Sequence, residues 1–166
     1  MKRILFICSG NMYRSAGAEV ILRAKLSEAG IDGWIVDSAG TLALDNAERP
    51  DAFGRILAEH GYPFGGYSKY VYSAEAASAD LILVMERQHQ YVLRGIVQEC
   101  DWGKIKMFME FCFGSKADLI DPSGFFSDDL YRETRDTLER GCDKIVEMIS
   151  NDRLVCTRTT TKTTLF

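Results

Sequence analysis

The 166-residue sequence contains no run of about eighteen apolar residues, the length that a membrane-spanning helix needs, so no membrane insertion is expected. The apolar stretch near the N-terminus is too short for a secretory signal, and a cytoplasmic protein is therefore expected. Basic residues are not in excess, because 20 Lys and Arg stand against 24 Asp and Glu, a net charge of −4. This balance argues against a nucleic-acid-binding protein, whose domains usually carry an excess of Lys and Arg.

Patterns that bind metals or form disulfides are also scarce. The chain has 2 histidines and 5 cysteines with no CxxC pair, so a zinc site is not expected. An odd number of cysteines at irregular spacing is a poor disulfide framework. Most of these thiols are expected to be ordinary buried side chains. Cys8 is the exception, because of the residues that surround it.

Short apolar runs alternate along the chain with longer segments whose apolar residues recur every three or four positions. The runs predict buried strands and the longer segments predict helices. The expected strands are Arg3–Cys8, Trp34–Val36, Leu81–Met85 and Ile105–Met109, and the expected helices are Ser15–Ala29, Pro50–Glu59, Arg87–Val97 and Asp128–Ile149. Strands that are apolar on both faces and alternate with helices are typical of a parallel sheet covered on both sides.

We therefore predict a doubly wound α/β fold, with a four-stranded parallel sheet, helices on both faces and a phosphate-binding loop after the first strand. One catalytic domain is expected over residues 1–150, followed by a Thr-rich tail over residues 151–166 to which no function is assigned. In such folds ligands bind beyond the carboxyl ends of the strands. Cys8 lies at such an end, and so does the segment that follows the fourth strand.

The stretch ICSGNMYRS joins the first strand to the first helix and has the features of an anion-binding loop. Successive backbone N–H groups and the start of a helix can surround a phosphate, and the guanidinium of Arg14 can bind two of its oxygens. Gly10 and Asn11 are residues that tolerate the left-handed backbone conformation. The residues expected to bind phosphate or support the loop are Ser9, Gly10, Asn11, Met12, Tyr13 and Ser15.

Cys8 is placed to be a nucleophile in this loop. A helix N-terminus and an arginine favour the thiolate form of a nearby cysteine, and a thiolate can attack phosphorus in line. Ser15 could donate its hydroxyl proton to the sulfur and stabilise it as a leaving group. The loop and Arg14 would already neutralise the phosphoryl oxygens, so no metal and no cofactor is expected.

The loop and its surroundings resemble the low-molecular-weight protein tyrosine phosphatases. The family signature is close to CxGNxCRSPxAE, and here it reads CSGNMYRSAGAE. The resemblance extends over residues 2 to 150 and includes Asp37–Thr41, Asp80–Met85 and Asp121–Pro122. It implies a phosphotyrosine protein phosphatase that forms a phosphocysteine at Cys8.

A more detailed likeness concerns the subtype. Leu44 and the run Met85–His89 look most like bacterial members that are encoded with exopolysaccharide export machinery. This resemblance implies a bacterial tyrosine autokinase as the protein substrate.

A general acid must protonate the oxygen that leaves from the substrate. The residues alone leave the choice open among 24 acidic side chains, although Asp121 follows the fourth strand and Pro122 stiffens its loop. The family's acid is the Asp of this Asp-Pro pair, which the resemblance carries over to Asp121. Asp118 is the alternative.

Several positions depart from the family pattern. Tyr13 stands where many family members have a second cysteine, which can protect the nucleophile as a disulfide. Tyr67 stands near a position where the family often has a histidine that braces the loop asparagine, and its hydroxyl could do the same. Met12 and Leu44 are expected to supply aliphatic walls for the substrate pocket. Phe125 and Phe126 follow Ser123–Gly124 and are candidates to flank the substrate ring, with a thinner wall as the alternative. His89 is a candidate base at the catalytic edge, although a surface position at the start of a helix is the more common case and is the one expected.

Three other functions are open. An arsenate reductase of this fold needs further cysteines, one of them just after the third strand, where this chain has Met85 and Glu86. An arginine phosphatase of this fold has a small Thr at the position of Met12. A phosphoprotein-binding module would need neither Cys8 nor Asp121.

Overall fold

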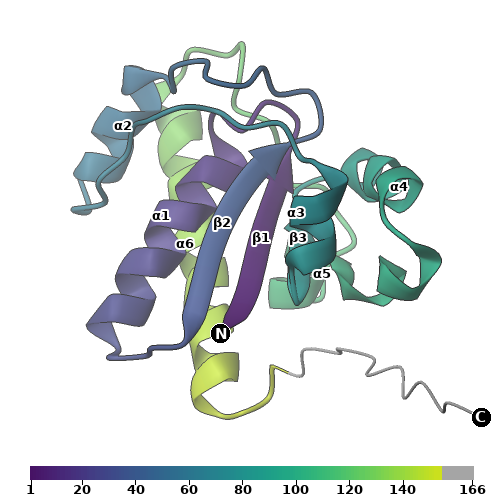
Figure 1. The fold of residues 1–166 in the computed structure, drawn as a ribbon. Helices are drawn as coiled ribbons and strands as arrows, with labels where there is room; N and C mark the ends of the chain where they lie inside the picture. The colour runs from purple at the N-terminus through teal and green to yellow at the C-terminus, as the bar shows by residue number, and fades with distance from the viewer. Residues whose placement is uncertain (155–166) are drawn as a thin grey trace, which may run out of the picture.

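The computed structural model describes residues 1–154 and contains a four-stranded sheet with the strand order β2-β1-β3-β4 (Figure 1). All three strand pairs are parallel. The strands are β1 (Lys2–Cys8), β2 (Trp34–Gly40), β3 (Leu81–Val84) and β4 (Ile105–Met107). The predicted doubly wound α/β fold is confirmed. The tail expected from 151 onward lies mostly outside the described residues.

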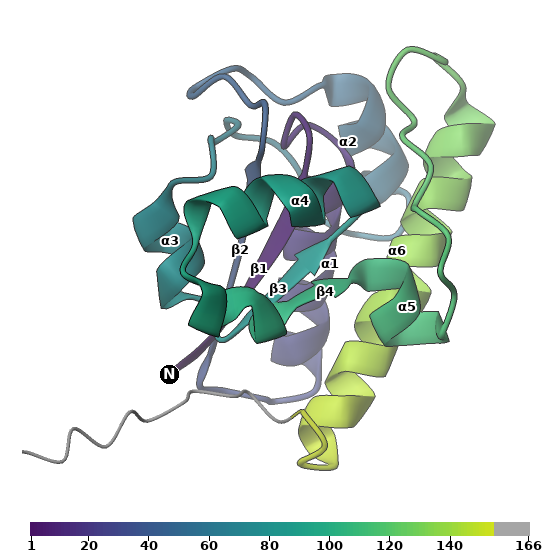
Figure 2. The same cartoon turned by 90° about the vertical axis from the view of Figure 1, so that its right-hand side faces the viewer.

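Helices cover both faces of the sheet. They are α1 (Arg14–Glu28), α2 (Asp51–Ala58), α3 (Ser73–Ser78), α4 (Arg87–Ile96), α5 (Phe108–Phe113) and α6 (Asp128–Ser150), with a 3-10 helix at Glu99–Lys104. Figure 2 shows α3 and α4 in front of the sheet and α1 behind it. No helix among the described residues is both long enough and apolar enough to cross a bilayer.

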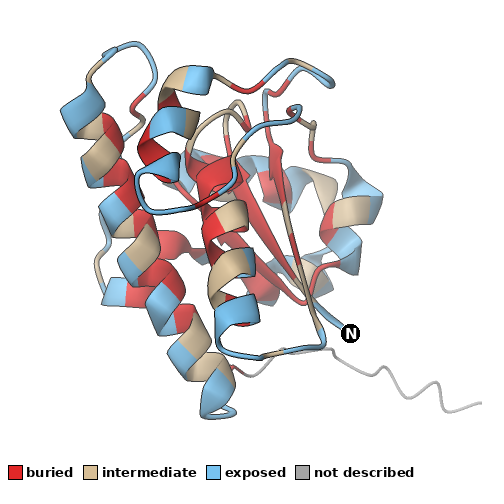
Figure 3. Ribbon diagram, turned by 90° about the vertical axis from the view of Figure 1, so that its left-hand side faces the viewer, coloured by how far each residue is buried: buried red, intermediate tan, exposed pale blue. Residues whose placement is uncertain are grey.

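The alternation of side chains along β1 explains these two layers. Ile4, Phe6 and Cys8 point into a core shared with α1, α2, α5 and α6, whereas Leu5 and Ile7 point into a smaller core with α3 and α4. Successive residues of a strand face opposite sides, and both sides of β1 are buried here. Figure 3 shows the strands buried between helices that keep an exposed outer side.

The register of the strands determines where the site lies. Cys8 at the end of β1 pairs with Gly40 at the end of β2, and Ile7 pairs with Val84 at the end of β3. The carboxyl ends of these three strands therefore meet at one edge of the sheet. The loop after β1 lies at this edge, at the top of Figure 1.

The structure corrects several predicted boundaries. β2 continues beyond Val36 to Gly40, and β4 ends at Met107 rather than Met109 because α5 begins at Phe108. The ring of Phe108 packs edge-on against Phe6 in the main core. The short α3 and the 3-10 helix were not predicted, because segments of six residues carry too little periodicity.

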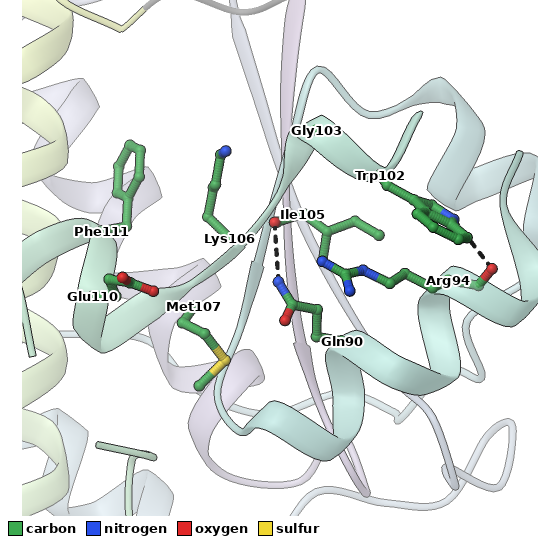
Figure 4. A pocket seen from close by; sticks show the side chains of 9 residues that line it. All are labelled: Gln90, Arg94, Trp102, Gly103, Ile105, Lys106, Met107, Glu110 and Phe111. Carbon is green, nitrogen blue, oxygen red and sulfur yellow. Dashed lines mark hydrogen bonds between the residues drawn. The ribbon is translucent and has the colours of Figure 1, made fainter. Parts of the chain in front are cut away.

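The edge strand β4 borders a hollow of about 520 Å³ (Figure 4). The Gln90 side chain of α4 donates a hydrogen bond to the carbonyl of Ile105, and Trp102 Nε1 donates to the carbonyl of Arg94. No described residue of the loop after β1 lines this hollow. The bond from Gln90 satisfies a backbone group of an edge strand that would otherwise be open to pairing.

Candidate active site

Cys8 ends β1 and its side chain is 3% exposed. Its sulfur lies 3.0 Å from the hydroxyl of Ser15 and accepts a hydrogen bond of 3.2 Å from the backbone N–H of Asn11. Ser15 is the second residue of α1, so the chain bends back over the sulfur within seven residues. The loop thus directs polar hydrogens of a strand-to-helix turn at one buried sulfur.

Asn11 has a positive φ of 55°, an unusual conformation for a residue other than glycine. Its buried side chain is fully hydrogen-bonded. Nδ2 donates to the hydroxyls of Ser15 (3.0 Å) and Ser38 (2.8 Å). Oδ1 accepts from the backbone N–H of Lys69 (2.9 Å) and from Nη2 of Arg49 (3.1 Å). These four bonds hold the loop in its strained conformation.

Gly40 at the end of β2 lets the loop approach closely. A Cβ atom at this position would lie 2.4 Å from the carbonyl oxygen of Ser9 and 2.9 Å from the nitrogen of Asn11. The next two backbone N–H groups donate to the loop, from Thr41 to Cys8 O (3.0 Å) and from Leu42 to Ser9 O (2.9 Å). Any side chain at Gly40 would displace the loop.

Arg14 begins α1 and its side chain is only 1% exposed. Nη2 donates to Asp121 (2.5 Å), while Nη1 donates to Glu86 (2.5 Å) and to the carbonyl of Leu119 (2.7 Å). The three acceptors come from segments that follow β3 and β4, and they fix the plane of the guanidinium. Two of the predicted catalytic residues, Arg14 and Asp121, are therefore in direct contact.

Asp118, the alternative acid, has a different position. Its carboxylate accepts a hydrogen bond of 2.9 Å from the backbone N–H of Arg87, the first residue of α4. It does not line the hollow above Cys8, whereas Asp121 does. The geometry therefore favours Asp121 as the acid.

A hollow of about 280 Å³ opens above the sulfur. Its lining residues are Cys8, Ser9, Gly10, Met12, Tyr13, Arg14, Leu42, Asp121 and Ser123. Of the predicted wall residues, Met12 lines it, but the exposed side chains of Leu44, Phe125 and Phe126 do not. Leu42 takes the aliphatic position that was expected of Leu44. A contact of Leu44 or the two phenylalanines with a substrate stays a prediction.

The expectation that His89 lies at the surface is wrong, because its side chain is completely buried. Nδ1 accepts a hydrogen bond of 3.1 Å from the backbone N–H of Glu86, and Nε2 lies 2.8 Å from the hydroxyl of Ser9. Burial lowers the pKa of His89 to about 4, against the opposite effect of the nearby Glu86 carboxylate. The ring is thus neutral at pH 7, and Nε2–H donates to Ser9.

Tyr13 occupies the place of a second cysteine. Its ring stacks on Tyr131 with centroids 5.6 Å apart and contacts Phe53. Burial is the main reason that the pKa of Tyr13 is raised to about 12, so the phenol is neutral. Tyr67 is 61% exposed and has no hydrogen bond to Asn11. The brace on Asn11 comes from Arg49 and Lys69 instead, which the sequence pattern did not indicate.

One cluster of the described residues has ligand atoms close enough to hold a metal ion. His60, Asp136 and Glu139 have such atoms within 4.8 Å of one another. Nδ1 of His60 already lies 2.9 Å from Glu139, and Asp136 pairs with Arg135. None of the three lines the hollow above Cys8.

Comparison with known proteins identifies the family. The model of the low molecular weight phosphotyrosine protein phosphatase family matches residues 3–155. The chain belongs to this family. Among curated relatives, the protein-arginine-phosphatase of Bacillus subtilis is 30% identical over 150 residues, which are 90% of this chain and 98% of that one. The low molecular weight protein-tyrosine-phosphatase of Streptomyces coelicolor is 29% identical over 162 residues, 94% of this chain and 93% of that one.

Among solved structures, this low molecular weight phosphatase is similar to a Cys-to-Ser mutant of the YwlE arginine phosphatase, in which the active-site serine is phosphorylated. The TM-score is 0.84 with 29% identity, and the match covers 91% of this chain and 97% of that one. A phosphorylated side chain in that site indicates that a phosphoenzyme forms in the family.

Proposed function

We propose that this phosphatase hydrolyses phosphotyrosine in proteins through a phosphocysteine at Cys8. The observation that carries the proposal is the position of the Cys8 sulfur. It lies at the floor of a hollow and accepts a hydrogen bond from the backbone N–H of Asn11 in the loop. Arg14 and Asp121 line the same hollow. A buried sulfur under an anion-binding loop is suited to attack a phosphoryl group.

In the first step, the Cys8 thiolate forms a bond to phosphorus while the bond from phosphorus to the tyrosine oxygen breaks. The loop N–H groups and Arg14 stabilise the charge on the phosphoryl oxygens. Asp121 donates its proton to the leaving tyrosine oxygen. When the phosphate takes the donors of Arg14, the bond from Arg14 to Asp121 is released, and the carboxyl group can face the leaving oxygen.

In the second step, a water molecule attacks phosphorus and Asp121 removes a proton from that water. The bond between phosphorus and sulfur breaks, and phosphate leaves. Ser15 supports the departing thiolate from 3.0 Å, since its hydroxyl can donate to the sulfur. Neither step requires a metal ion, because the positive charge comes from Arg14 and the loop.

Phosphotyrosine is the proposed substrate because the sulfur lies at the floor of the hollow. A long, flat side chain can carry its phosphate from a protein surface to this depth, and a phosphoserine is too short. Met12 and Leu42 give the tyrosine ring apolar contacts at the wall.

Phosphoarginine is the second candidate, because the relative from Bacillus subtilis is a protein-arginine-phosphatase. Phosphoarginine is also long enough to reach the sulfur, and Asp121 could contact its guanidinium. Met12 argues for the flat ring, since an aliphatic side chain gains more from contact with a ring than with a guanidinium.

As the protein substrate we propose a bacterial tyrosine autokinase of exopolysaccharide export. The support is the likeness of Leu44 and Met85–His89 to members encoded with that machinery. Incubation with the phosphorylated autokinase of the same organism tests this partner. An unchanged phosphotyrosine signal on its tail would contradict it, whatever the activity on peptides.

The central experiment compares Cys8→Ser with the wild type on peptides that carry phosphotyrosine, phosphoarginine, phosphoserine or phosphothreonine. We expect turnover of phosphotyrosine by the wild type, unaffected by a metal chelator, and essentially none by Cys8→Ser, which still binds phosphate. Cys100→Ser is the matched control, because Cys100 is exposed and does not line the hollow. Substantial activity of Cys8→Ser would refute the mechanism, and equal turnover of phosphoarginine would refute the substrate preference.

A further inference from the structure

Arg49 is a buried arginine beneath the loop that the mechanism above does not use. It precedes α2, and its side chain is 8% exposed. Nη2 donates to Asn11 Oδ1 (3.1 Å) and to the hydroxyl of Ser38 (3.4 Å), and Nη1 donates to the carbonyl of Gly65 (3.3 Å). The guanidinium also lies 5.9 Å from the centroid of the Phe64 ring.

A buried carboxylate accompanies this arginine. Glu19 on α1 accepts a hydrogen bond of 2.5 Å from the hydroxyl of Ser38, and its carboxylate lies 3.6 Å from Nη2 of Arg49. The other cation on Glu19 is Arg23, whose side chain is 51% exposed. A buried negative charge below the loop disfavours a second one on the sulfur, so its balance by Arg49 matters to Cys8.

A chain of hydrogen bonds connects this buried pair to the sulfur of Cys8. The hydroxyl of Ser38 donates to Glu19 and accepts from Asn11, so the amide of Asn11 is oriented by the same group that Arg49 contacts. Asn11 Nδ2 also donates to Ser15, which leaves the Ser15 hydroxyl proton free to point to the sulfur (3.0 Å) or to the carbonyl of Ala39 (3.3 Å).

We propose that Arg49 is a positioning residue for the phosphate-binding loop: it holds Asn11 in its left-handed conformation and balances Glu19 beneath Cys8. Two further observations agree with this role. Burial lowers the pKa of Arg49, while the negative charges of Glu19 and of Cys8 act in the opposite direction and favour its charged form. Nε of Arg49 has no hydrogen-bond partner among the described residues, so its hydrogen bonds to Asn11, Ser38 and Gly65 all come from the two Nη atoms.

This inference rests on the proposed function of Cys8, and its test therefore measures the loop without turnover. Arg49→Met removes the charge and the donors at similar length. The rate at which iodoacetamide alkylates Cys8 should fall several-fold at neutral pH and approach the wild-type rate at high pH. The dissociation constant of inorganic phosphate should rise. Arg23→Gln is the matched control for phosphate binding, because it removes the exposed cation from Glu19 without touching Asn11. We expect this variant to bind phosphate as tightly as the wild type.

The double variant Glu19→Gln/Arg49→Met separates the two roles and avoids an unpaired buried carboxylate. Without the charge of Glu19, the alkylation rate should return toward the wild type, whereas phosphate binding should stay weak because Asn11 still lacks a donor. Arg49→Lys, which keeps the charge, should also restore most of the alkylation rate. If folded Arg49→Met binds phosphate as tightly as Arg23→Gln, the proposal is wrong. If Arg49→Met does not fold, the double variant takes its place in the same comparison. Such tight binding is distinct from a failure of the proposed function, in which the wild type itself has no phosphatase activity.

Discussion

The buried imidazole of His89 lies 2.8 Å from the hydroxyl of Ser9 and connects the start of α4 to the phosphate-binding loop. The same helix start carries Glu86, whose carboxylate holds Arg14. The neutral ring of His89 thus joins the backbone N–H of Glu86, which follows β3, to the side chain of Ser9, which follows β1. This arrangement requires His89 to stay unprotonated.

The first prediction concerns acid stability. The pKa of His89 falls from 6.5 to about 4 in the folded protein, so the unfolded chain binds the proton more readily between these values. Stability from the neutral ring is present above pH 6.5 and is lost as the pH falls toward 4. The charged groups around the ring are Glu86, Arg14, Asp121 and Asp118.

Thermal unfolding between pH 4 and 7 should therefore depend less on pH in His89→Asn than in the wild type. His60→Asn is the control, because His60 is exposed and its ring forms hydrogen bonds with Glu139 rather than with the phosphate-binding loop. Parallel curves for His89→Asn and the wild type would mean that folding does not lower the pKa of His89, which would contradict this prediction.

The second prediction concerns the acid. Asp121→Asn should slow the hydrolysis of phenyl phosphate by about 100-fold or more, the usual contribution of a general acid. The loss on p-nitrophenyl phosphate should be much smaller, because its leaving oxygen needs little protonation. Steady-state rates on both esters measure this. Asp118→Asn should leave the ratio of the two rates unchanged, since Asp118 binds the backbone of Arg87. Equal losses on both esters for Asp121→Asn would assign Asp121 a structural role.

The third prediction concerns oxidation. Peroxide converts a reactive thiolate to a sulfenic acid, which a neighbouring thiol can trap as a disulfide. Tyr13 offers no thiol, so prolonged exposure to peroxide should inactivate the wild type beyond recovery by added thiol. Tyr13→Cys should recover more activity under the same exposure, although loss of the stacking on Tyr131 should lower its melting temperature. Tyr13→Phe is the control. Identical recovery of the wild type, Tyr13→Cys and Tyr13→Phe would contradict this prediction.

The fourth prediction concerns the core. A Cβ atom at Gly141 would lie 2.2 Å from the ring of Phe108, so Gly141→Ala should destabilise the fold by about 1–3 kcal/mol. Gly95 in α4 has no atom within 4 Å of the position that its Cβ would occupy. Gly95→Ala should therefore stabilise by about 0.5–1 kcal/mol, because alanine loses less backbone entropy in a helix. Denaturant unfolding of both variants measures this, and equal effects at the two positions would contradict the packing of α6 on α5.

The sequence by itself determined the features that depend on local pattern. The apolar run before Cys8, the glycine and asparagine within the loop and the periodic helix after it were enough to predict the strand, the turn and the helix. The alternation of apolar runs with helices predicted the parallel sheet, because each strand is buried on both faces. Cys8, Arg14 and Asp121 were named from this pattern and from the family resemblance.

Only the tertiary structure decided which distant side chains support that loop. Arg49 and Ser38 meet Asn11 from 38 and 27 residues away, and His89 meets Ser9 from 80 residues away. No periodicity marks such contacts, because they arise where the carboxyl ends of separate strands meet. For the same reason, the sequence could not show that Leu42 rather than Leu44 lines the hollow. The backbone N–H of Leu42 donates to the carbonyl of Ser9, and this tertiary hydrogen bond holds Leu42 beside the loop.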